Sequence, residues 1–211
     1  MLKRIEEFSS DRPLTEGMVH PDPIRQFGVW YEEAERARIT MPNAMVLATS
    51  TPAGKPSARV VLLKDYSERG FTFFTNYRSR KGNELELNPY ASLVFHWKEL
   101  ERQVRIDGSV STISEEESNA YFRTRPRESQ IGALASHQSS TVPGRKELED
   151  AAADIQRRFE GVPVPRPEHW GGYCVYPEHI EFWQGRKGRL HDRLLYSRSG
   201  INTWTIVRLQ P

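Results

Sequence analysis

Two arginines and a histidine near the carboxyl end of the chain, Arg189, His191 and Arg193, alternate with Leu190 and Asp192. If this segment is an extended strand, its period of two places all three of those side chains on one face. Unpaired charge is costly in a hydrophobic core, whereas arginine offers a planar fork of donors to phosphate or carboxylate. The spacing therefore indicates a site for an anionic ligand.

The residues before this segment support a site without excluding the simpler alternative. Gly185 and Gly188 fit a tight turn, and Trp183 offers a flat apolar surface. An isolated arginine-rich strand is more often a solvated basic hairpin, and that interpretation stays open. The concentration of tryptophan, histidine and same-face arginines favours a binding site.

A second candidate for anion binding is the run Ser79-Arg80-Lys81 at the start of a predicted helix. Free backbone N–H groups, the positive end of the helix dipole and two cations together suit a phosphate. Cations in the first turn oppose the dipole and gain nothing for stability unless an anion binds there. The alternative is an exposed helix start that carries stray cations.

Cations also stand at both ends of a predicted strand that runs from Arg59 to Lys64. Five residues separate them, so a regular strand would place them on opposite faces, where they could serve two different anionic groups. The alternative is a buried strand with charged tips.

Polar side chains recur every four residues at Tyr121, Arg125 and Ser129, which is a helical stripe. Pro126 disfavours a helical Arg125 and ends the helix there, but the three could still converge on one anion across the helix end. On a predicted strand, Gln103 carries an amide that can both donate and accept, as the edge of a heteroaromatic ring requires. A polar helix face and a structural amide are the alternatives.

Composition excludes several classes of function. The 30 basic and 28 acidic residues leave a net charge of +2, without the broad basic surface that nucleic acid requires. A single cysteine, Cys174, fits a reducing compartment, and the six histidines lack the spacing of metal ligands. The chain shows no apolar membrane span, and its start, MLKRIEEF, lacks a signal-peptide core. Because catalytic triads and paired carboxylates are also missing, the reactivity would come from a cofactor.

The elements that must position these groups are helices and short antiparallel strands. The sequence predicts a flexible arm over 1–20 and one domain over 21–211, a mainly β, α+β fold in which helices decorate an antiparallel β-barrel. Predicted helices begin at Asp22-Pro23, at Ser79 and at the capping box that starts with Ser114, and a fourth covers 144–160. Predicted strands cover 44–51, 57–64 and 71–76 as a meander, then 91–97, 102–111, 173–175, 180–184, 189–197 and 203–209, with a loop over 124–143.

Several ordered motifs from about Asp22 to Pro211 resemble the pyridoxamine 5′-phosphate oxidase family, FMN enzymes of vitamin B6 metabolism. The motifs are RVVLLK (59–64), FFTNYRSRKGNELELNP (73–89), LERQVRIDG (100–108), YFRTRPRESQIGALAS (121–136), QSS (138–140), WGGY (170–173) and IEFWQGRKGRLHDR (180–193). The resemblance implies a split-barrel flavin fold, a cytoplasmic homodimer and FMN bound at the subunit interface, without metal, membrane or nucleic acid.

The resemblance also assigns residues. It places FMN on Arg59, Val60, Val61, Leu62, Leu63, Lys64, Phe74, Thr75, Arg80, Lys81, Gln103, Gln138, Ser139, Trp183 and Arg193. It places the substrate on Lys64, Tyr121, Arg125, Ser129, Arg189, Leu190 and His191, with Arg189 and His191 beside the reacting carbon.

The implied reaction oxidises pyridoxamine 5′-phosphate or pyridoxine 5′-phosphate to pyridoxal 5′-phosphate. A hydride passes to FMN, dioxygen reoxidises the flavin to give hydrogen peroxide, and the amine substrate releases ammonia. Two alternatives stay open: a non-catalytic split-barrel protein that binds FMN or pyridoxal phosphate, and a related flavin reductase that uses a nicotinamide.

Overall fold

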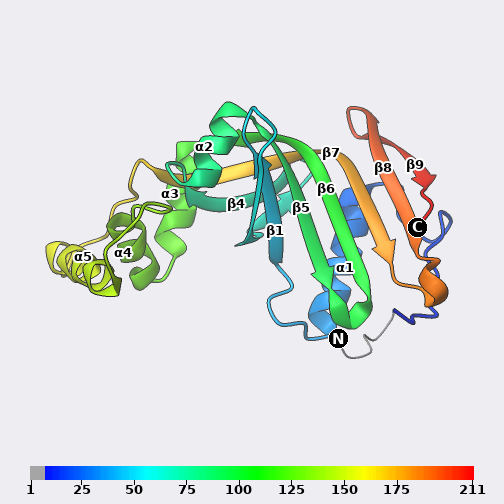
Figure 1. Ribbon diagram of the computed structural model, residues 1–211, viewed down its shortest axis with the longest axis horizontal. Helices are drawn as coiled ribbons and strands as arrows, with labels where there is room; N and C mark the ends of the chain where they lie inside the picture. Colours follow the sequence, from blue (N-terminus) through cyan, green and yellow to red (C-terminus); the bar gives the residue numbers. More distant parts are fainter. Residues whose placement is uncertain (1–7) are drawn as a thin grey trace.

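An antiparallel sheet of nine strands forms the frame of the computed structural model, which describes residues 8–211 (Figure 1). The strands are β1 (Ala44–Ser50), β2 (Pro56–Leu62), β3 (Asp65–Ser67), β4 (Gly70–Asn76), β5 (Tyr90–Trp97), β6 (Arg102–Thr112), β7 (Trp170–Gln184), β8 (Asp192–Gly200) and β9 (Thr203–Arg208). The helices are α1 (Pro23–Arg36), α2 (Arg80–Leu87), α3 (Glu115–Thr124), α4 (Arg127–Ala135) and α5 (Arg145–Arg158), with 3₁₀ turns at Lys98–Leu100 and Lys187–Arg189. No helix within residues 8–211 is long and apolar enough to cross a membrane.

The sheet curls because its longest strand, β7, pairs with different strands along its first and second halves. The strand order is β2-β1-β5-β6-β7-β4-β3, and β8 and β9 extend from the second half of β7. The first half of β7 pairs with β4 and the second half with β8, while β6 follows it throughout with a register shift after Asp107. Only glycine fits at Gly108 beside this shift, because a Cβ there would lie 2.0 Å from the carbonyl oxygen of Tyr176.

The barrel closes at one point and is open beyond it. The backbone N–H of Lys64, just after β2, donates to the carbonyl of Thr72 in β4 at 2.8 Å. No ladder joins β2 to β4 among the described strands, so these two edges part beyond that bond. The predicted antiparallel split barrel with helices is confirmed.

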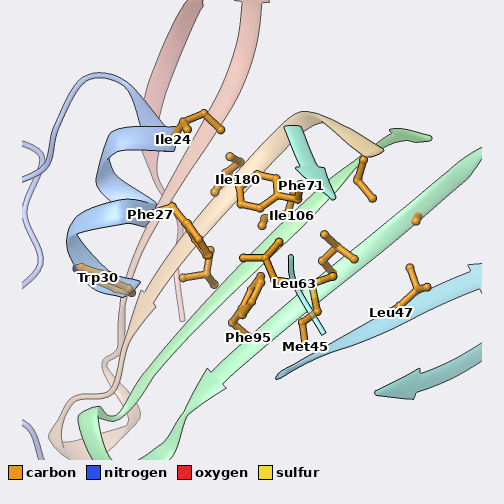
Figure 2. Packing of buried hydrophobic residues seen from close by; sticks show 14 of the residues in the cluster. Ile24, Phe27, Trp30, Met45, Leu47, Leu63, Phe71, Phe95, Ile106 and Ile180 are labelled. Atoms are coloured by element: carbon orange, nitrogen blue, oxygen red, sulfur yellow. The ribbon is translucent and has the colours of Figure 1, made fainter. Parts of the chain in front are cut away.

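Helix α1 fills the concave side of the sheet (Figure 2). The side chain of Asp22 caps it by accepting from the N–H of Ile24 at 2.8 Å, as the sequence predicts. Phe27 is fully buried, and its ring centroid lies 5.0 Å from those of Phe71 and Phe95. The core thus joins the helix to strands from both halves of the sheet.

Three predictions of local structure are wrong. The predicted loop 124–143 contains α4, because Pro126 ends α3 and also starts a new helix that buries Ile131. The predicted strands 173–175 and 180–184 are one strand, β7, because β6 pairs with it continuously from 173 to 184. The predicted meander fails at its third strand, since β4 pairs with β7 and not with β2.

The described part of the amino-terminal segment lies on the carboxyl-terminal hairpin. Leu14 is buried, and its backbone N–H donates to Asp192 at 3.1 Å. The N–H of Ser10 donates to the carboxylate of Glu101 at 2.6 Å, and the ring of Phe8 meets Trp183 edge-on. Residues 1–7 of the predicted arm lie outside the described residues, and the division at residue 20 stays a prediction.

Candidate functional site

A cavity of about 530 Å³ lies where β2 and β4 part, beside the corner between α3 and α4. Most of the residues that line it are predicted site residues. Its lining consists of Arg59, Val60, Val61, Leu62, Lys64, Phe74, Thr75, Lys81, Tyr121, Thr124, Arg125, Pro126, Ser129, Gln138 and Trp170. Sequence reasoning missed Thr124, Pro126 and Trp170 as site residues, although Trp170 opens the quoted WGGY motif.

Lys81 is a buried cation that has only neutral partners within residues 8–211. Its Nζ donates to Thr75 Oγ1 at 3.0 Å, to Ser79 Oγ at 3.1 Å and to Gln138 Oε1 at 2.7 Å. Burial, with a smaller contribution from the charge of Arg59, lowers the pKa of Lys81 from 10.5 to about 8. A buried ammonium without a carboxylate partner favours the binding of an anion beside it.

The first turn of α2 holds Lys81 at this place. Ser79 caps the helix by accepting from the N–H of Gly82, as the sequence predicts. Any side chain at Gly82 would place its Cβ 1.8 Å from the carbonyl oxygen of Tyr77, so glycine alone allows this close approach. The helix start therefore lies against the end of β4.

Arg125 is the second cation with unmet bonding capacity. Its Nη1 is the only buried side-chain nitrogen or oxygen of residues 8–211 that has no hydrogen-bond partner. The guanidinium lies 4.5 Å from the ring centroid of Trp170, and burial lowers its pKa. Because an unpaired buried donor is destabilising, this geometry favours an anionic ligand in the cavity.

Aromatic rings form the wall between these cations. Phe74 stacks on Tyr121 at a centroid distance of 4.0 Å and on Trp170 at 5.3 Å. Tyr121 and Ser129 line the same cavity as Arg125, although α3 ends between them and a second helix begins. The wall offers a flat apolar surface beside hydroxyl groups.

The expectation that Arg59 and Lys64 lie on opposite faces stays a prediction, because a lining that also includes the neighbours Val60 and Val61 does not distinguish the two faces. Strand β2 ends at Leu62, before Lys64, and both residues line one cavity. Leu63 between them is 5% exposed and belongs to the hydrophobic core. Its side chain is therefore not part of the cavity wall.

A second group of predicted site residues lies on the other half of the sheet. Gln103, Trp183 and Arg193 are register partners across β6, β7 and β8, so they form one row. The Arg193 guanidinium donates to both carboxylate oxygens of Glu181, at 2.8 and 2.9 Å. None of the three lines the cavity described above within a single chain.

The extended conformation predicted for 189–193 is wrong at its start. Gly188 and Arg189 have φ angles of 67° and 60°, so the chain turns there, and β8 begins only at Asp192. Arg189 and Leu190 are exposed on this turn. The ring of His191 lies 4.7 Å from that of Trp183, and its Nδ1 accepts from the N–H of Arg186 at 3.1 Å. That bond leaves Nε2 of His191 for another partner.

Arg80 and Ser139 line a neighbouring cavity of about 460 Å³. The N–H of Arg80 donates to Ser139 Oγ at 3.2 Å, and Gln138 lines both cavities. Most predicted site residues thus lie in two adjoining cavities or in one separate row on the sheet, while Leu63 lies in the core and Arg189, Leu190 and His191 lie at the turn before β8.

Two family models match the chain. Residues 31–159 match the model described as pyridoxamine 5′-phosphate oxidase, and residues 170–211 match the pyridoxine 5′-phosphate oxidase C-terminal dimerisation region. These two matches cover both the cavity and the row.

Relatives of high identity carry related names. The pyridoxine/pyridoxamine 5′-phosphate oxidase of Rubrobacter xylanophilus is 63% identical over 94% of this chain and 91% of its own length. The enzyme of that name from Ralstonia nicotianae, numbered 1, is 58% identical over 92% of this chain and 91% of its own length.

Solved structures share the fold. PhzG from Burkholderia lata, in complex with tetrahydrophenazine-1-carboxylic acid, has a TM-score of 0.89 and 35% identity over 96% of this chain and all of its own. An FMN-binding protein from Nostoc punctiforme has a TM-score of 0.71 and 17% identity over 90% of this chain and 97% of its own. On the strength of the family models and the high identities, the chain belongs to the pyridoxamine 5′-phosphate oxidase family.

Proposed function

We propose that this protein is an FMN-dependent oxidase that converts pyridoxamine 5′-phosphate and pyridoxine 5′-phosphate to pyridoxal 5′-phosphate. The observation that carries the proposal is the pair of incompletely paired cations in one cavity. Lys81 has only neutral partners among the described residues, and Arg125 has a buried donor without a partner. FMN and the substrate each carry one phosphate, so each of these two cations could bind one phosphate.

The residues fit FMN as well as the substrate. Lys81, Gln138 and the start of α2 would hold the FMN phosphate, with Arg59 and Arg80 nearby. Arg125, Tyr121 and Ser129 would hold the substrate phosphate on the far wall of the cavity. The remaining predicted FMN contacts, Gln103, Trp183 and Arg193, suit the polar edge and the flat face of a ring.

A homodimer would unite the two groups of residues. In one chain the row of Gln103, Trp183 and Arg193 lies outside the cavity. Residues 170–211, which contain part of this row, match a region described as a dimerisation region. We therefore place FMN between two copies of the chain, with the cavity of one copy facing the row of the other.

When bound, FMN would take a hydride from C4′ of the substrate and pass the electrons to dioxygen, which gives hydrogen peroxide. The protein's own part is positioning and electrostatic stabilisation. His191 presents Nε2 because its Nδ1 already accepts from Arg186, and the turn at Gly188 leaves Arg189 exposed, where it would face the substrate ring. The cavity cations fix the phosphate and thereby the direction in which the ring lies.

Anaerobic reduction tests the proposed reaction. The protein purified with FMN should be yellow, and pyridoxine 5′-phosphate added without oxygen should bleach the flavin absorbance. A flavin that stays oxidised would contradict the oxidase and favour a non-catalytic flavin-binding protein. Bleaching by a reduced nicotinamide in place of the substrate would indicate a flavin reductase.

Replacing His191 by alanine should lower kcat/KM for pyridoxine 5′-phosphate about a hundredfold, in the range of a lost proton donor or acceptor. FMN content should stay at the wild-type level, because the phosphate seat around Lys81 does not include His191. Steady-state kinetics and flavin absorbance per protein measure the two quantities, and His179→Ala, exposed on β7, is the control. A parallel loss of FMN would contradict the separate roles.

A further inference from the structure

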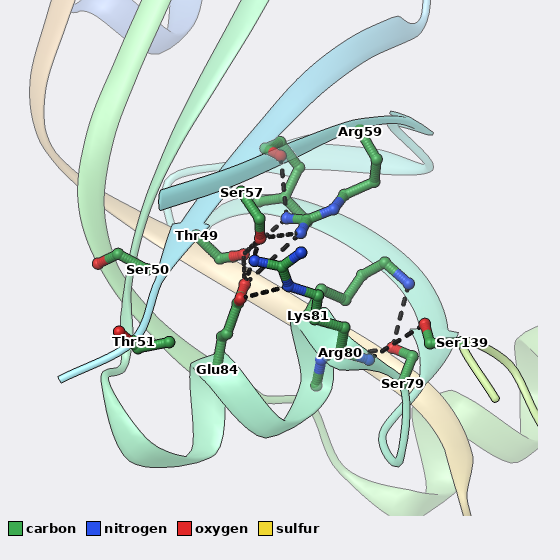
Figure 3. A network of polar contacts seen from close by, with 12 residues as sticks. Thr49, Ser50, Thr51, Ser57, Arg59, Ser79, Arg80, Lys81, Glu84 and Ser139 are labelled. Carbon is green, nitrogen blue, oxygen red and sulfur yellow. Dashed lines mark hydrogen bonds and ion pairs between the residues drawn. The ribbon is translucent and has the colours of Figure 1, made fainter. Parts of the chain in front are cut away.

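Glu84 is a buried carboxylate on α2 that lines the cavity of about 460 Å³ and belongs to the polar network of Figure 3. It lies one turn after Arg80 on α2, and its Oε1 accepts from Arg80 Nε at 2.9 Å. Its Oε2 accepts from the hydroxyls of Thr49 and Ser57, each at 2.5 Å. Burial alone would raise the pKa of Glu84, but the bonds from Ser57, Thr49 and Arg80 lower it to about 2. The side chain is therefore ionised at neutral pH.

The two hydroxyls that donate to Glu84 also hold Arg59. Nη1 of Arg59 donates to Thr49 Oγ1 at 2.6 Å, and Nη2 donates to Ser57 Oγ. A hydroxyl has one proton, so its donation to Glu84 turns its lone pairs towards the guanidinium. Glu84 thus sets the direction of both hydroxyls, and Nη2 of Arg59 also lies 3.5 Å from its Oε2.

The carboxylate of Glu84 is important because three cations lie close to it. Arg59, Arg80 and Lys81 gather around the start of α2, and the charge of Arg59 contributes to the lowered pKa of Lys81. Within residues 8–211, Glu84 is the one carboxylate that forms an ion pair with Arg59 or Arg80. It forms ion pairs with both arginines, whereas Lys81 has only neutral partners among the described residues.

We propose that Glu84 is a positioning residue of the cofactor phosphate site, which holds Arg80 directly and Arg59 through Thr49 and Ser57. The inference rests on the proposed function, because it takes the FMN phosphate as the anion that these cations meet. Glu84 itself need not touch the cofactor. Its role is to fix where the two guanidinium groups lie before the phosphate arrives.

Glutamine is the sharpest replacement because it keeps the shape and removes the charge. Its amide offers one acceptor oxygen and places an NH₂ donor among Thr49, Ser57 and Arg59. A hydroxyl that accepts from this NH₂ has less capacity to accept from Arg59, which then loses its fixed position. Removal of the negative charge also lessens the repulsion between this side chain and a phosphate. If that effect dominated, the FMN affinity would rise, which is the opposite of the result that the inference predicts.

The experiment compares FMN with riboflavin, which has the same ring and no phosphate, on the apoprotein by flavin fluorescence. In Glu84→Gln the dissociation constant of FMN should rise about 10- to 100-fold, as for other residues that orient a ligand-binding side chain. That of riboflavin should stay within about twofold, since no phosphate is involved. Glu86→Gln, exposed on the same helix, is the matched control and should change neither.

Thr49→Val provides a second variant that keeps the ion pair between Glu84 and Arg80. It should weaken FMN binding in the same direction and add little to Glu84→Gln, because both act on Arg59. Unchanged or tighter FMN binding in Glu84→Gln would overturn the inference and leave the proposed function intact. Equal loss of both flavins would also overturn it, by showing a structural role. A wild-type protein that binds neither flavin would overturn the proposed function together with the inference.

Discussion

Replacing Lys81 by methionine is expected to raise the dissociation constant of FMN about 100-fold, which corresponds to about 3 kcal/mol. The ammonium is already desolvated, since it is 8% exposed and meets three neutral oxygens. A phosphate would add the countercharge that these partners lack, and methionine keeps the unbranched shape of the side chain, one atom shorter, without the charge. Titration of the apoprotein by flavin fluorescence gives the constant.

Riboflavin separates this effect from damage to the fold. It carries no phosphate, so its binding to Lys81→Met should stay close to that of the wild type. Lys98→Met, at an exposed 3₁₀ turn, is a control for the loss of one positive charge. Equal weakening of FMN and riboflavin would contradict a phosphate seat at Lys81.

The lowered pKa of Lys81 adds a pH dependence with a definite sign. In the empty site the ammonium loses its proton as the pH rises through about 8, whereas a bound phosphate would keep it charged. FMN affinity should therefore be constant between about pH 7, where the phosphate is a dianion, and pH 8, and fall about tenfold per pH unit above that, until the bound form titrates. Lys81→Arg, which stays charged, should remove the dependence.

The same shift affects the stability of the apoprotein in the opposite direction. Between about 8 and 10.5 the unfolded lysine holds a proton that the folded one has released, so this group adds stability as the pH rises. Urea unfolding of the apoprotein between pH 8 and 10.5 checks the sign, because the midpoint of the wild type should rise relative to that of Lys81→Met.

The binding measurement gives the contrary outcome for the site. A wild-type FMN affinity that stays constant above pH 8 would contradict the assignment of Lys81 to the FMN phosphate.

Local chemistry made the starts of α1, α2 and α3 predictable. Asp22, Ser79 and Ser114 each accept from a backbone N–H in the first turn that follows, as the sequence predicts. Such caps depend on residues two or three positions apart, which the sequence displays directly. The antiparallel strands and the α+β class could also be predicted, because their patterns too involve residues that are close in the sequence.

Pairing between distant segments could not be predicted. The sequence places the strand of Phe71 after that of Arg59, yet β4 pairs with β7, about 100 residues later. Glu84 shows the same limit at the site, since its spacing from Arg80 is that of an ordinary surface ion pair. Only the fold brings Thr49 and Ser57 of the first hairpin to its carboxylate. The left-handed Arg189 likewise depends on a turn that its residue type disfavours.

Replacing Arg125 by methionine is expected to raise KM for pyridoxine 5′-phosphate about 100-fold, the loss of a buried charge-assisted contact. FMN affinity should change little, because the seat around Lys81 is made by other residues. The unfolding free energy of the apoprotein should not fall. Leaving Nη1 of Arg125 buried without a partner costs about 1–3 kcal/mol, which methionine recovers. The cation–π contact with Trp170 that is lost is worth about 1–2 kcal/mol, an offset of similar size.

Activity and stability therefore move independently at Arg125, and this separates a ligand-binding arginine from a structural one. Steady-state kinetics give KM, and urea unfolding of the apoprotein gives the stability. Arg123→Met, exposed in the last turn of α3 two residues before Arg125, controls for the loss of charge near the cavity and should leave KM unchanged. If Arg125→Met instead lowers stability by several kcal/mol and leaves KM unchanged, the guanidinium supports Trp170 and the fold. The substrate phosphate would then have to meet other cations of the cavity, of which Lys64 lies 6.0 Å from the Tyr121 ring.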